Sequence, residues 1–315
     1  MDLSDATILI TGGAGFVGSH LAARLQADNE VRVVDDLRNG RREWVPEGAE
    51  LYVGDIADPA TLECCLTGAV DIVVHAAADK SAARDEIAQF RQNNELTTAV
   101  LARMEAIGVS KIAFMSSSTV YGEAPRPTPE DHTPMEPISI YGASKLAEEA
   151  LLSVYAHSHD VQAWIFRFAN IVGPRLQVGA VIPDFIKKLR QSPETLEILG
   201  DGRQEKSYMH VEDCVDAMCH LIEETDGSLN TFNLGTRSTT SVTTIADVVA
   251  EQMGLDPSYE FTGGDRGWTG DVPRMRLATE RLRETGYEPR LTSTEAVRSC
   301  AAGLVETGLF DASTR

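Results

Sequence analysis

The chain has 315 residues, of which 43% are hydrophobic and 24% are charged, so it is long enough for one large core or two lobes. Its 48 acidic against 28 basic residues give a formal net charge of -20, which argues against a nucleic-acid partner, because phosphate binding needs clustered Lys and Arg. An acidic excess of this size suits a very salty cytoplasm, where screening relieves the self-repulsion.

The cysteines and the N-terminal segment favour a cytoplasmic protein. The cysteines form no CxxC pair and no spacing typical of zinc, so we expect reduced core residues and no metal site. Residues 1–7 are acidic and polar, and no apolar run approaches the roughly 18 residues of a membrane span, so we expect no membrane partner. The cysteines are Cys64, Cys65, Cys214, Cys219 and Cys300.

A glycine-rich turn follows the first expected strand. Residues 8–10 are apolar and predict a buried strand, the segment TGGAGFVG at 11–18 predicts a turn, and a helical pattern follows. Gly12 permits the tight turn, Gly15 lets the backbone approach a pyrophosphate at the helix N-terminus, and Gly18 lets helix and strand pack closely. This order predicts a dinucleotide site.

An acidic residue ends the second expected strand, residues 31–34. Asp35 stands where a carboxylate can hydrogen-bond the ribose diol of adenosine, which favours NAD and repels the 2′-phosphate of NADP. The alternative, in which Asp35 and Asp36 only open a polar loop, is outweighed by the glycine turn before them. Three arginines follow, and because they could bind a 2′-phosphate, NADP stays open as an alternative cofactor. They are Arg38, Arg41 and Arg42.

Small and hydroxyl residues follow two later strands. Residues 76–78 are alanines, and residues 116–119 are hydroxyl-bearing, both at the strand ends where open α/β sheets bind ligands. His75, just before the alanines, is expected to be structural. The later strands are expected at 51–53, 71–75 and 112–115, and a helix is expected from Asp58 and Pro59 to near Gly68.

Tyr141 and Lys145 lie four residues apart in the segment YGASK and share one face of an expected helix. A neighbouring ammonium stabilises a phenolate and lowers the pKa of a hydroxyl that otherwise titrates near 10. Tyr141 is therefore a candidate general base, and a serine from residues 116–119 can converge with it. The alternative is an amphipathic helix with one aromatic and one solvated charge.

Together these motifs resemble the extended short-chain dehydrogenase/reductases that act on nucleotide sugars, the NAD-dependent epimerase/dehydratase family, and within it the UDP-glucose 4-epimerases. The resemblance covers nearly the whole chain and rests on TGGAGFVG, GDI at 54–56, HAAA at 75–78, SSSTVYG at 116–122 and YGASK. It implies a Rossmann-type, doubly wound parallel α/β sheet with a smaller C-terminal α/β substrate lobe. The NAD-binding domain is expected at 1–168, with segments at about 205–240 returning to it, and an interleaved nucleotide-sugar lobe at 169–315.

The resemblance also implies the site residues, with NAD as cofactor. Ser117, four residues before Tyr121, matches the family's catalytic Ser or Thr beside Tyr141 and Lys145, with Ser118 as near competitor. The cofactor-contacting positions are Gly12, Gly15, Phe16, Val17, Gly18, Asp35, Asp36, Asn39, Gly40, Asp55, Ile56, Ala76, Ala77, Ala78, Lys80, Asn94, Ser116, Tyr141, Lys145 and Phe168. The substrate-contacting positions are Lys80, Ser117, Ser118, Tyr141, Asn170, Val181, Ile198, Lys206, Tyr208, Arg266 and Asp271.

Two substrate-side positions depart from the family pattern. Lys206 stands where many members carry an Arg to the nucleotide phosphates, and an ammonium lacks the bidentate fork of a guanidinium. Trp268 occupies the other usual Arg position, where Arg266 is expected to substitute. UDP is therefore favoured by family resemblance alone, and another nucleoside diphosphate stays open.

The expected activity is reversible inversion at C4 of a UDP-glucose or UDP-galactose type sugar, an isomerase reaction with no net redox change. The family's dehydratases carry Asp-Glu directly after the catalytic hydroxyl residue and its decarboxylases carry a nearby Glu, whereas Ser118 and Thr119 follow Ser117 here. A 4-reductase that consumes NADH needs the same triad and stays open. An inactive NAD-sensing protein is disfavoured because the triad is complete.

A homodimer is expected, because the family pairs two helices of each subunit across a two-fold axis. Apolar stripes on two expected helices exceed what one sheet face can cover. The alternative is that both stripes pack within one subunit. The stripes are Leu146, Ala147 and Ala150 on one helix, and Leu96, Val100 and Met104 on the other.

Overall fold

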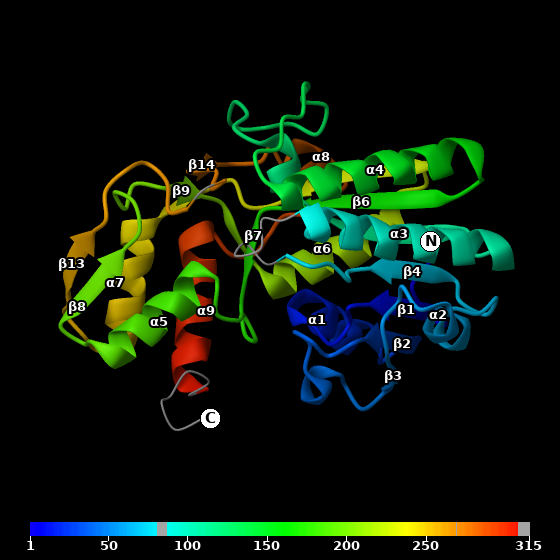
Figure 1. The fold of residues 1–315 in the computed structure, drawn as a ribbon, viewed down its shortest axis with the longest axis horizontal. Helices are drawn as coiled ribbons and strands as arrows, with labels where there is room; N and C mark the ends of the chain where they lie inside the picture. The colour runs from blue at the N-terminus through cyan, green and yellow to red at the C-terminus, as the bar shows by residue number, and fades with distance from the viewer. Residues whose placement is uncertain (81–86, 269, 308–315) are drawn as a thin grey trace.

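The structure is a computed structural model that describes residues 1–80, 87–268 and 270–307. These residues form a large body around a parallel sheet and a smaller body beside it (Figure 1). The strands of the large sheet are β1 (Thr7–Thr11), β2 (Glu30–Asp35), β3 (Ala49–Val53), β4 (Ile72–His75), β5 (Lys111–Ser117), β6 (Gln162–Phe168) and β11 (Leu229–Leu234). Its helices are α1 (Phe16–Leu25), α2 (Pro59–Cys65), α3 (Ile87–Ile107), α4 (Ile140–Ser158) and α6 (Val211–Glu224).

The large sheet is a doubly wound parallel sheet, as the sequence predicts. Its strand order is β11-β6-β5-β4-β1-β2-β3, and every neighbouring pair runs parallel. The chain moves outward from β1 to β3 and then crosses to β4 on the other side of β1. Ligands of open α/β sheets bind outside the carboxyl ends of the strands at such a switch point. The glycine turn after β1 and the alanines after β4 meet at this edge.

Strand β1 shows how the sheet divides the core into two layers. Ile8 and Ile10 belong to a hydrophobic cluster with α1 and α6, whereas Leu9 belongs to a second cluster with α2, α3 and α4. Successive side chains of a strand point to opposite faces, so a continuous apolar run fits a strand covered on both sides. The apolar segment at 8–10 therefore predicts this buried position correctly.

Local signals place the helix ends close to where the sequence predicts them. Asp58 caps α2 by accepting a hydrogen bond from the Ala60 amide, and Pro59 is the first helical residue. The helix ends at Cys65, three residues before Gly68. The sequence also predicts a helix at 243–253 ended by Gly254, and α7 (Val242–Met253) ends at this glycine in the left-handed conformation with φ +67°.

The smaller body holds short strands and three longer helices. Strand β7 pairs with β10, β8 pairs with β13, and β9 pairs with both β12 and β14. These elements, with two 3-10 turns and α8, complete the described chain. They are η1 (Arg42–Trp44), η3 (Ser118–Tyr121), β7 (Asn170–Val172), α5 (Val181–Gln191), β8 (Thr195–Ile198), β9 (Glu205–Lys206), β10 (Tyr208–His210), β12 (Thr240–Ser241), α7 (Val242–Met253), β13 (Ser258–Phe261), β14 (Arg274–Met275), α8 (Glu280–Glu284) and α9 (Ser293–Glu306).

Two burial predictions are wrong. The stripe on α3, formed by Leu96, Val100 and Met104, is buried in the cluster beneath the sheet, whereas on α4 Leu146 is half-buried against the cluster around Tyr121 and Ala150 is exposed. The α3 stripe is covered within one subunit because α3 packs against α4 and α2 as well as against the sheet. Cys64 is exposed, while the other four cysteines are buried and free.

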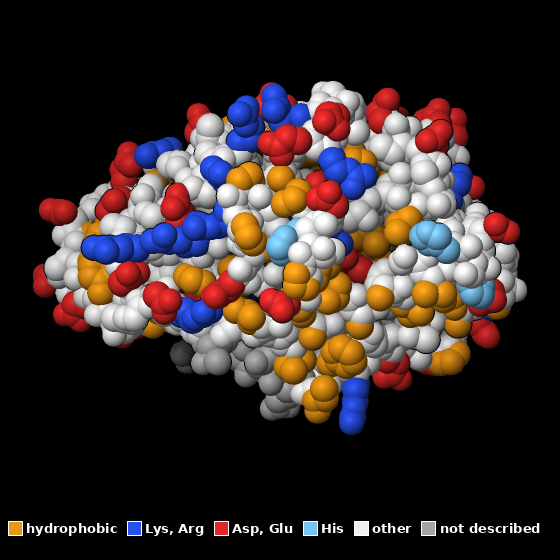
Figure 2. All heavy atoms as spheres, turned by 90° about the horizontal axis from the view of Figure 1, so that it is seen from above, with side chains coloured by type: hydrophobic (Ala, Val, Ile, Leu, Met, Phe, Trp, Pro, Cys, Tyr) orange, Lys and Arg blue, Asp and Glu red, His pale blue; other side chains and the backbone are white. Residues whose placement is uncertain are grey.

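The outer surface carries the acidic excess. Figure 2 shows acidic side chains scattered over the face seen from above, with basic side chains between them.

Within the described part of the chain, no helix combines the length and apolar character needed to cross a membrane.

Candidate active site

The turn between β1 and α1 is packed too closely for any side chain. Gly12 has φ +66°, and a Cβ there would lie 2.8 Å from the backbone nitrogen of Ala77; one on Gly18 would lie 2.5 Å from the Gly12 carbonyl oxygen. Gly15 is the N-cap of α1, and no side chain caps this end. The first amides of α1 are therefore directed at the sheet edge without a side-chain acceptor. Such a helix end fits a pyrophosphate.

Asp35 is fixed at the carboxyl end of β2. Its carboxylate accepts hydrogen bonds from the amides of Ala14 at 3.0 Å and Leu37 at 2.9 Å. Burial raises the pKa of Asp35, and the two amide hydrogen bonds act against that rise. A Cβ on Gly40 would lie 2.6 Å from a carboxylate oxygen, so the following loop closes directly over this side chain. The donor set and the close packing suit a ribose diol.

Arg38, the arginine nearest this carboxylate, is already neutralised. Its Nε donates to Asp36, and its Nη2 lies 3.6 Å from the Asp55 carboxylate. A guanidinium held by two carboxylates is poorly placed to bind a 2′-phosphate. The arrangement therefore favours NAD over NADP. The remaining residues predicted around the adenosine lie in the same loops, with Ile56 buried and the Asn39 carbonyl accepting from Gln177 at 2.7 Å.

The alanine segment after β4 is tied to the glycine turn. The amides of Ala76 and Ala77 both donate to the Thr11 hydroxyl at 3.2 Å, which joins the two strand ends. Lys80 is exposed at the end of this described stretch, and Asn94 on α3 donates to the Phe90 carbonyl at 2.8 Å.

The three predicted catalytic residues are on adjoining elements. Ser117 ends β5, caps η3, and accepts hydrogen bonds from the amide and hydroxyl of Thr119 at 3.2 and 2.9 Å. Tyr141 is in the first turn of α4, behind the N-cap Ser139. A Cβ on Gly142 would lie 2.7 Å from the Thr119 carbonyl oxygen, so this turn lies directly against η3. The fold thus brings the Tyr141 and Ser117 segments together.

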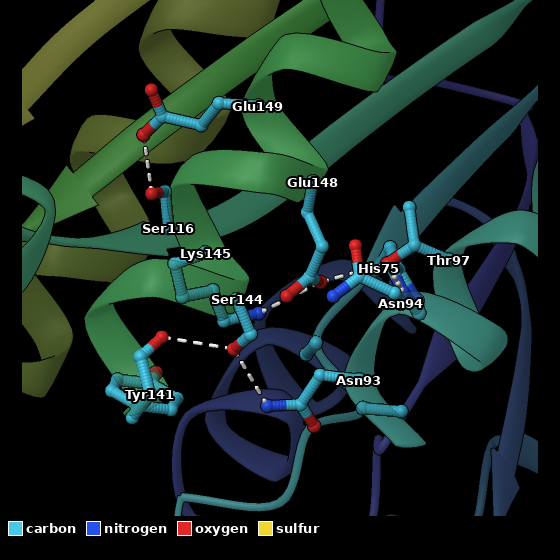
Figure 3. Close-up of polar contacts among 12 residues, drawn as sticks. His75, Asn93, Asn94, Thr97, Ser116, Tyr141, Ser144, Lys145, Glu148 and Glu149 are labelled. Carbon is cyan, nitrogen blue, oxygen red and sulfur yellow. Dashed lines mark hydrogen bonds and ion pairs between the residues drawn. The ribbon is translucent and has the colours of Figure 1, made fainter. Parts of the chain in front are cut away.

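Lys145 is buried and does not bond the Tyr141 hydroxyl directly. Its Nζ lies 3.3 Å from Glu148, 4.4 Å from the centre of the Phe114 ring and 6.0 Å from the centre of the Tyr141 ring (Figure 3). Burial raises the pKa of Tyr141, and the Glu148 charge raises it further. In the protein groups by themselves, burial and Glu148 therefore act against the phenolate that Lys145 is expected to favour.

Two further predicted site residues have side chains that are already bonded or packed within the protein. The Ser116 hydroxyl donates to Glu149 at 2.5 Å, away from Ser117, so it is not free to bind a cofactor. Ile198 is fully buried in the core, so its side chain is not exposed to a substrate. His75 is a structural residue, as predicted, because both ring nitrogens bond threonine hydroxyls.

The substrate-side residues form an ion-pair network. Lys206 pairs with Asp271, and Arg266 pairs with Glu123 while also donating to the Asp271 carbonyl at 2.6 Å. Asn170 begins β7, Val181 begins α5, and Tyr208 is buried at the start of β10. Glu123, Glu148 and Thr97 were not predicted from the sequence. Only Glu148 had a local signal, an acid one helical turn after Lys145.

Comparison with known proteins gives a consistent result. Residues 8–235 match the profile of the NAD dependent epimerase/dehydratase family. A UDP-glucose 4-epimerase of Mycolicibacterium smegmatis is 32% identical over 92% of this chain and 95% of its own length. UDP-glucuronic acid decarboxylase 2 of Arabidopsis thaliana is 31% identical over 90% of this chain and 65% of its own. A crystal structure of a UDP-galactose 4-epimerase superposes with a TM-score of 0.86 and 41% identity, covering 96% of this chain and 99% of that one.

Proposed function

The chain belongs to the NAD-dependent epimerase/dehydratase family of enzymes, and from this premise we propose that it inverts C4 of a nucleotide-diphosphate sugar of the UDP-glucose and UDP-galactose type. The observation that carries the proposal is the arrangement of Ser117, Tyr141 and Lys145 at the carboxyl edge of the sheet, beside the turn at Gly12. The epimerases among the relatives support the same reading.

The residues around β1 and β2 would hold NAD. The amides at the start of α1 would bind its pyrophosphate, and Asp35 would accept the hydroxyls of its adenosine ribose. Bound NAD supplies a hydride acceptor and donor, so C4 is oxidised to a ketone and reduced again without net redox change. We assign residues 1–168, with β11 and α6, to this cofactor-binding body, and 169–315 to the substrate side.

Tyr141 would remove the proton of the sugar 4-hydroxyl and return it after the ketone has turned over. Ser117 would donate a hydrogen bond to the same oxygen, and Lys145 would favour the phenolate of Tyr141. Reduction on either face of one flat ketone gives both C4 epimers, which makes the reaction reversible.

The segment after the catalytic serine separates this chemistry from that of related enzymes. Ser118 and Thr119 form η3 behind Ser117 and carry no carboxylate. Loss of water from a sugar, the reaction of a 4,6-dehydratase, needs an added acid/base pair, which this segment does not supply. On the substrate side, Asn170, Lys206 and Arg266 are the polar groups assigned to the diphosphate, with Tyr208 as a wall. Among the described residues, Lys206 and Arg266 each pair with a single carboxylate, and the diphosphate would compete with that carboxylate for them.

The proposal predicts interconversion of UDP-glucose and UDP-galactose by the purified protein without added reductant. Either sugar should give a mixture of both, with no stoichiometric change in nicotinamide absorbance, measured at high salt to suit the acidic surface. A stoichiometric absorbance change would identify a 4-reductase instead. If neither sugar reacts, the nucleotide is tested by a thermal-shift panel of UDP, dTDP, GDP, CDP and ADP. A shift with another nucleotide and none with UDP would show that the assignment to UDP is wrong.

We also propose a cytoplasmic homodimer formed through the outer faces of α3 and α4. Leu96, Val100 and Met104 are buried and cannot contact a second subunit. The apolar surface that supports a dimer is therefore smaller than the sequence suggests, and consists of exposed Ala150 and of Val154, which is 53% exposed. Light scattering at high salt should give twice the 34.2 kDa mass of one chain. Val154→Glu should shift that mass toward the monomer, and a monomer mass for the unmodified protein would exclude the dimer.

A further inference from the structure

Two adjacent glutamates leave α4 in different directions, and only one of them contacts the catalytic group. Glu149 points toward Ser116 and Arg167, whereas Glu148 points toward Lys145 (Figure 3). Both carboxylates are almost fully buried. The side chains of Lys145 and Glu148 are 2% and 1% exposed, so solvent screens their interaction very little.

Glu148 is the end point of a directed chain of hydrogen bonds. The Thr97 hydroxyl donates to Glu148 Oε2 at 2.7 Å, so His75 Nε2, 3.0 Å away, must donate to Thr97. That tautomer leaves His75 Nδ1 to accept from the Thr11 hydroxyl at 2.7 Å. Thr11 in turn accepts from Ala76 and Ala77. The chain therefore connects the glycine-turn edge to the ammonium of Lys145 through one carboxylate.

The charges around Lys145 and Tyr141 are few. Glu148 comes from α4, His75 from β4, and the face of the Phe114 ring from β5. Burial lowers the pKa of His75 to about 3, so this ring is neutral at working pH. Among the described residues in these contacts, Glu148 is the one negative charge that faces Lys145 and Tyr141.

The burial of the Glu148 carboxylate is not explained by a gain in stability. Its Oε1 is buried and has no hydrogen-bond partner among the described residues. A buried, half-satisfied carboxylate costs free energy, and a neutral side chain of the same size would avoid most of that cost. Glu149 differs, because Arg167 and Ser116 together bond both of its oxygens.

We propose that Glu148 is a positioning residue that holds the Lys145 ammonium and sets the pH range in which Tyr141 acts as a base. The catalytic role given to Glu148 rests on the proposed function, but the contacts of Glu148 with Lys145 and Thr97 do not depend on the substrate. The negative charge of Glu148 opposes formation of the Tyr141 phenolate. It also offers Lys145 a fixed alternative partner, which keeps the ammonium from turning freely toward the phenol.

The test is the titration of Tyr141 in NAD-loaded protein, read from the ultraviolet absorbance of the ionised phenol. The Tyr141→Phe variant supplies the background in each case. Glu148→Gln removes the charge and keeps the shape, so the Tyr141 midpoint should move to lower pH by about one unit, the size expected for one nearby buried charge. The acidic limb of kcat/KM against pH should move in the same direction by a similar amount.

Glu149→Gln is the matched control, because it changes a neighbouring and equally buried glutamate that does not contact Lys145. It should lower stability without moving the Tyr141 midpoint. If Glu148→Gln does not fold, Glu148→Met replaces it: this variant removes the same charge with an apolar side chain of similar length and should shift the midpoint in the same direction. An unchanged or raised midpoint in the folded variant overturns the proposal. The phenol absorbance is measured without turnover, so it tests the role of Glu148 even if the proposed substrate is wrong. A wrong substrate is detected separately, by the activity assay.

Discussion

Replacing Tyr141 with Phe should lower kcat about 10³-fold, because the variant keeps the ring but loses the group that takes the proton of the sugar hydroxyl. The ring lies in the first turn of α4 against η3, so its packing is preserved. NAD content should stay near that of the unmodified protein, since the pyrophosphate and ribose positions at Gly12 and Asp35 are untouched. The checks are initial rates with UDP-galactose and cofactor released on denaturation.

Tyr155→Phe is the control for this substitution. Tyr155 is on the same helix, and its hydroxyl lies 3.4 Å from the exposed side chain of Glu105, away from the catalytic groups. Its removal should leave kcat within about two-fold, as expected for a surface change. Equal losses in the two variants would show that Tyr141 acts through the packing of α4 and not as a base.

Replacing Arg167 with Met should lower the free energy of unfolding by about 3–5 kcal/mol, because it leaves a buried carboxylate without its cation. Arg167 is 5% exposed and donates from Nε and Nη2 to Glu149 at 3.0 and 2.7 Å. Its Nη1 also donates to the Tyr121 hydroxyl and the Glu130 carbonyl, both at 2.8 Å. One side chain therefore joins β6, α4 and the loop after η3, and urea denaturation followed by circular dichroism measures the loss.

An exposed ion pair supplies the comparison. Arg298 and Glu251 join α9 to α7 at 2.7 Å, but their side chains are 46% and 61% exposed. Arg298→Met should cost no more than about 1 kcal/mol, because water and salt already screen the pair. Adding Glu149→Leu to Arg167→Met should recover part of the loss, since the stranded charge is then gone. A loss for Arg167→Met as small as that for Arg298→Met would contradict the role given to burial.

The local pattern predicted the fold well, because the signals for its elements act over a few residues. The apolar run at 8–10, the glycine turn and the capping residues Asp58 and Gly254 each depend on backbone geometry within one or two turns of chain. The alternation of strands and helices predicted a parallel sheet, but its strand order was decided by the tertiary structure. Tyr141 and Lys145 were visible because helix periodicity alone places them on one face.

Tertiary contacts decided which faces are covered and which charges are paired. The stripe of Leu96, Val100 and Met104 has the same spacing whether it meets a second subunit or the chain's own sheet, and the fold buries it internally. Lys145 and Glu148 are one turn apart on α4 and could have met in solvent, but the packing of α4 against α3 and β5 buries the pair, leaving its side chains 2% and 1% exposed. Sequence periodicity specifies where a side chain points along its own element, but burial and ion pairing depend on what the rest of the chain places opposite it.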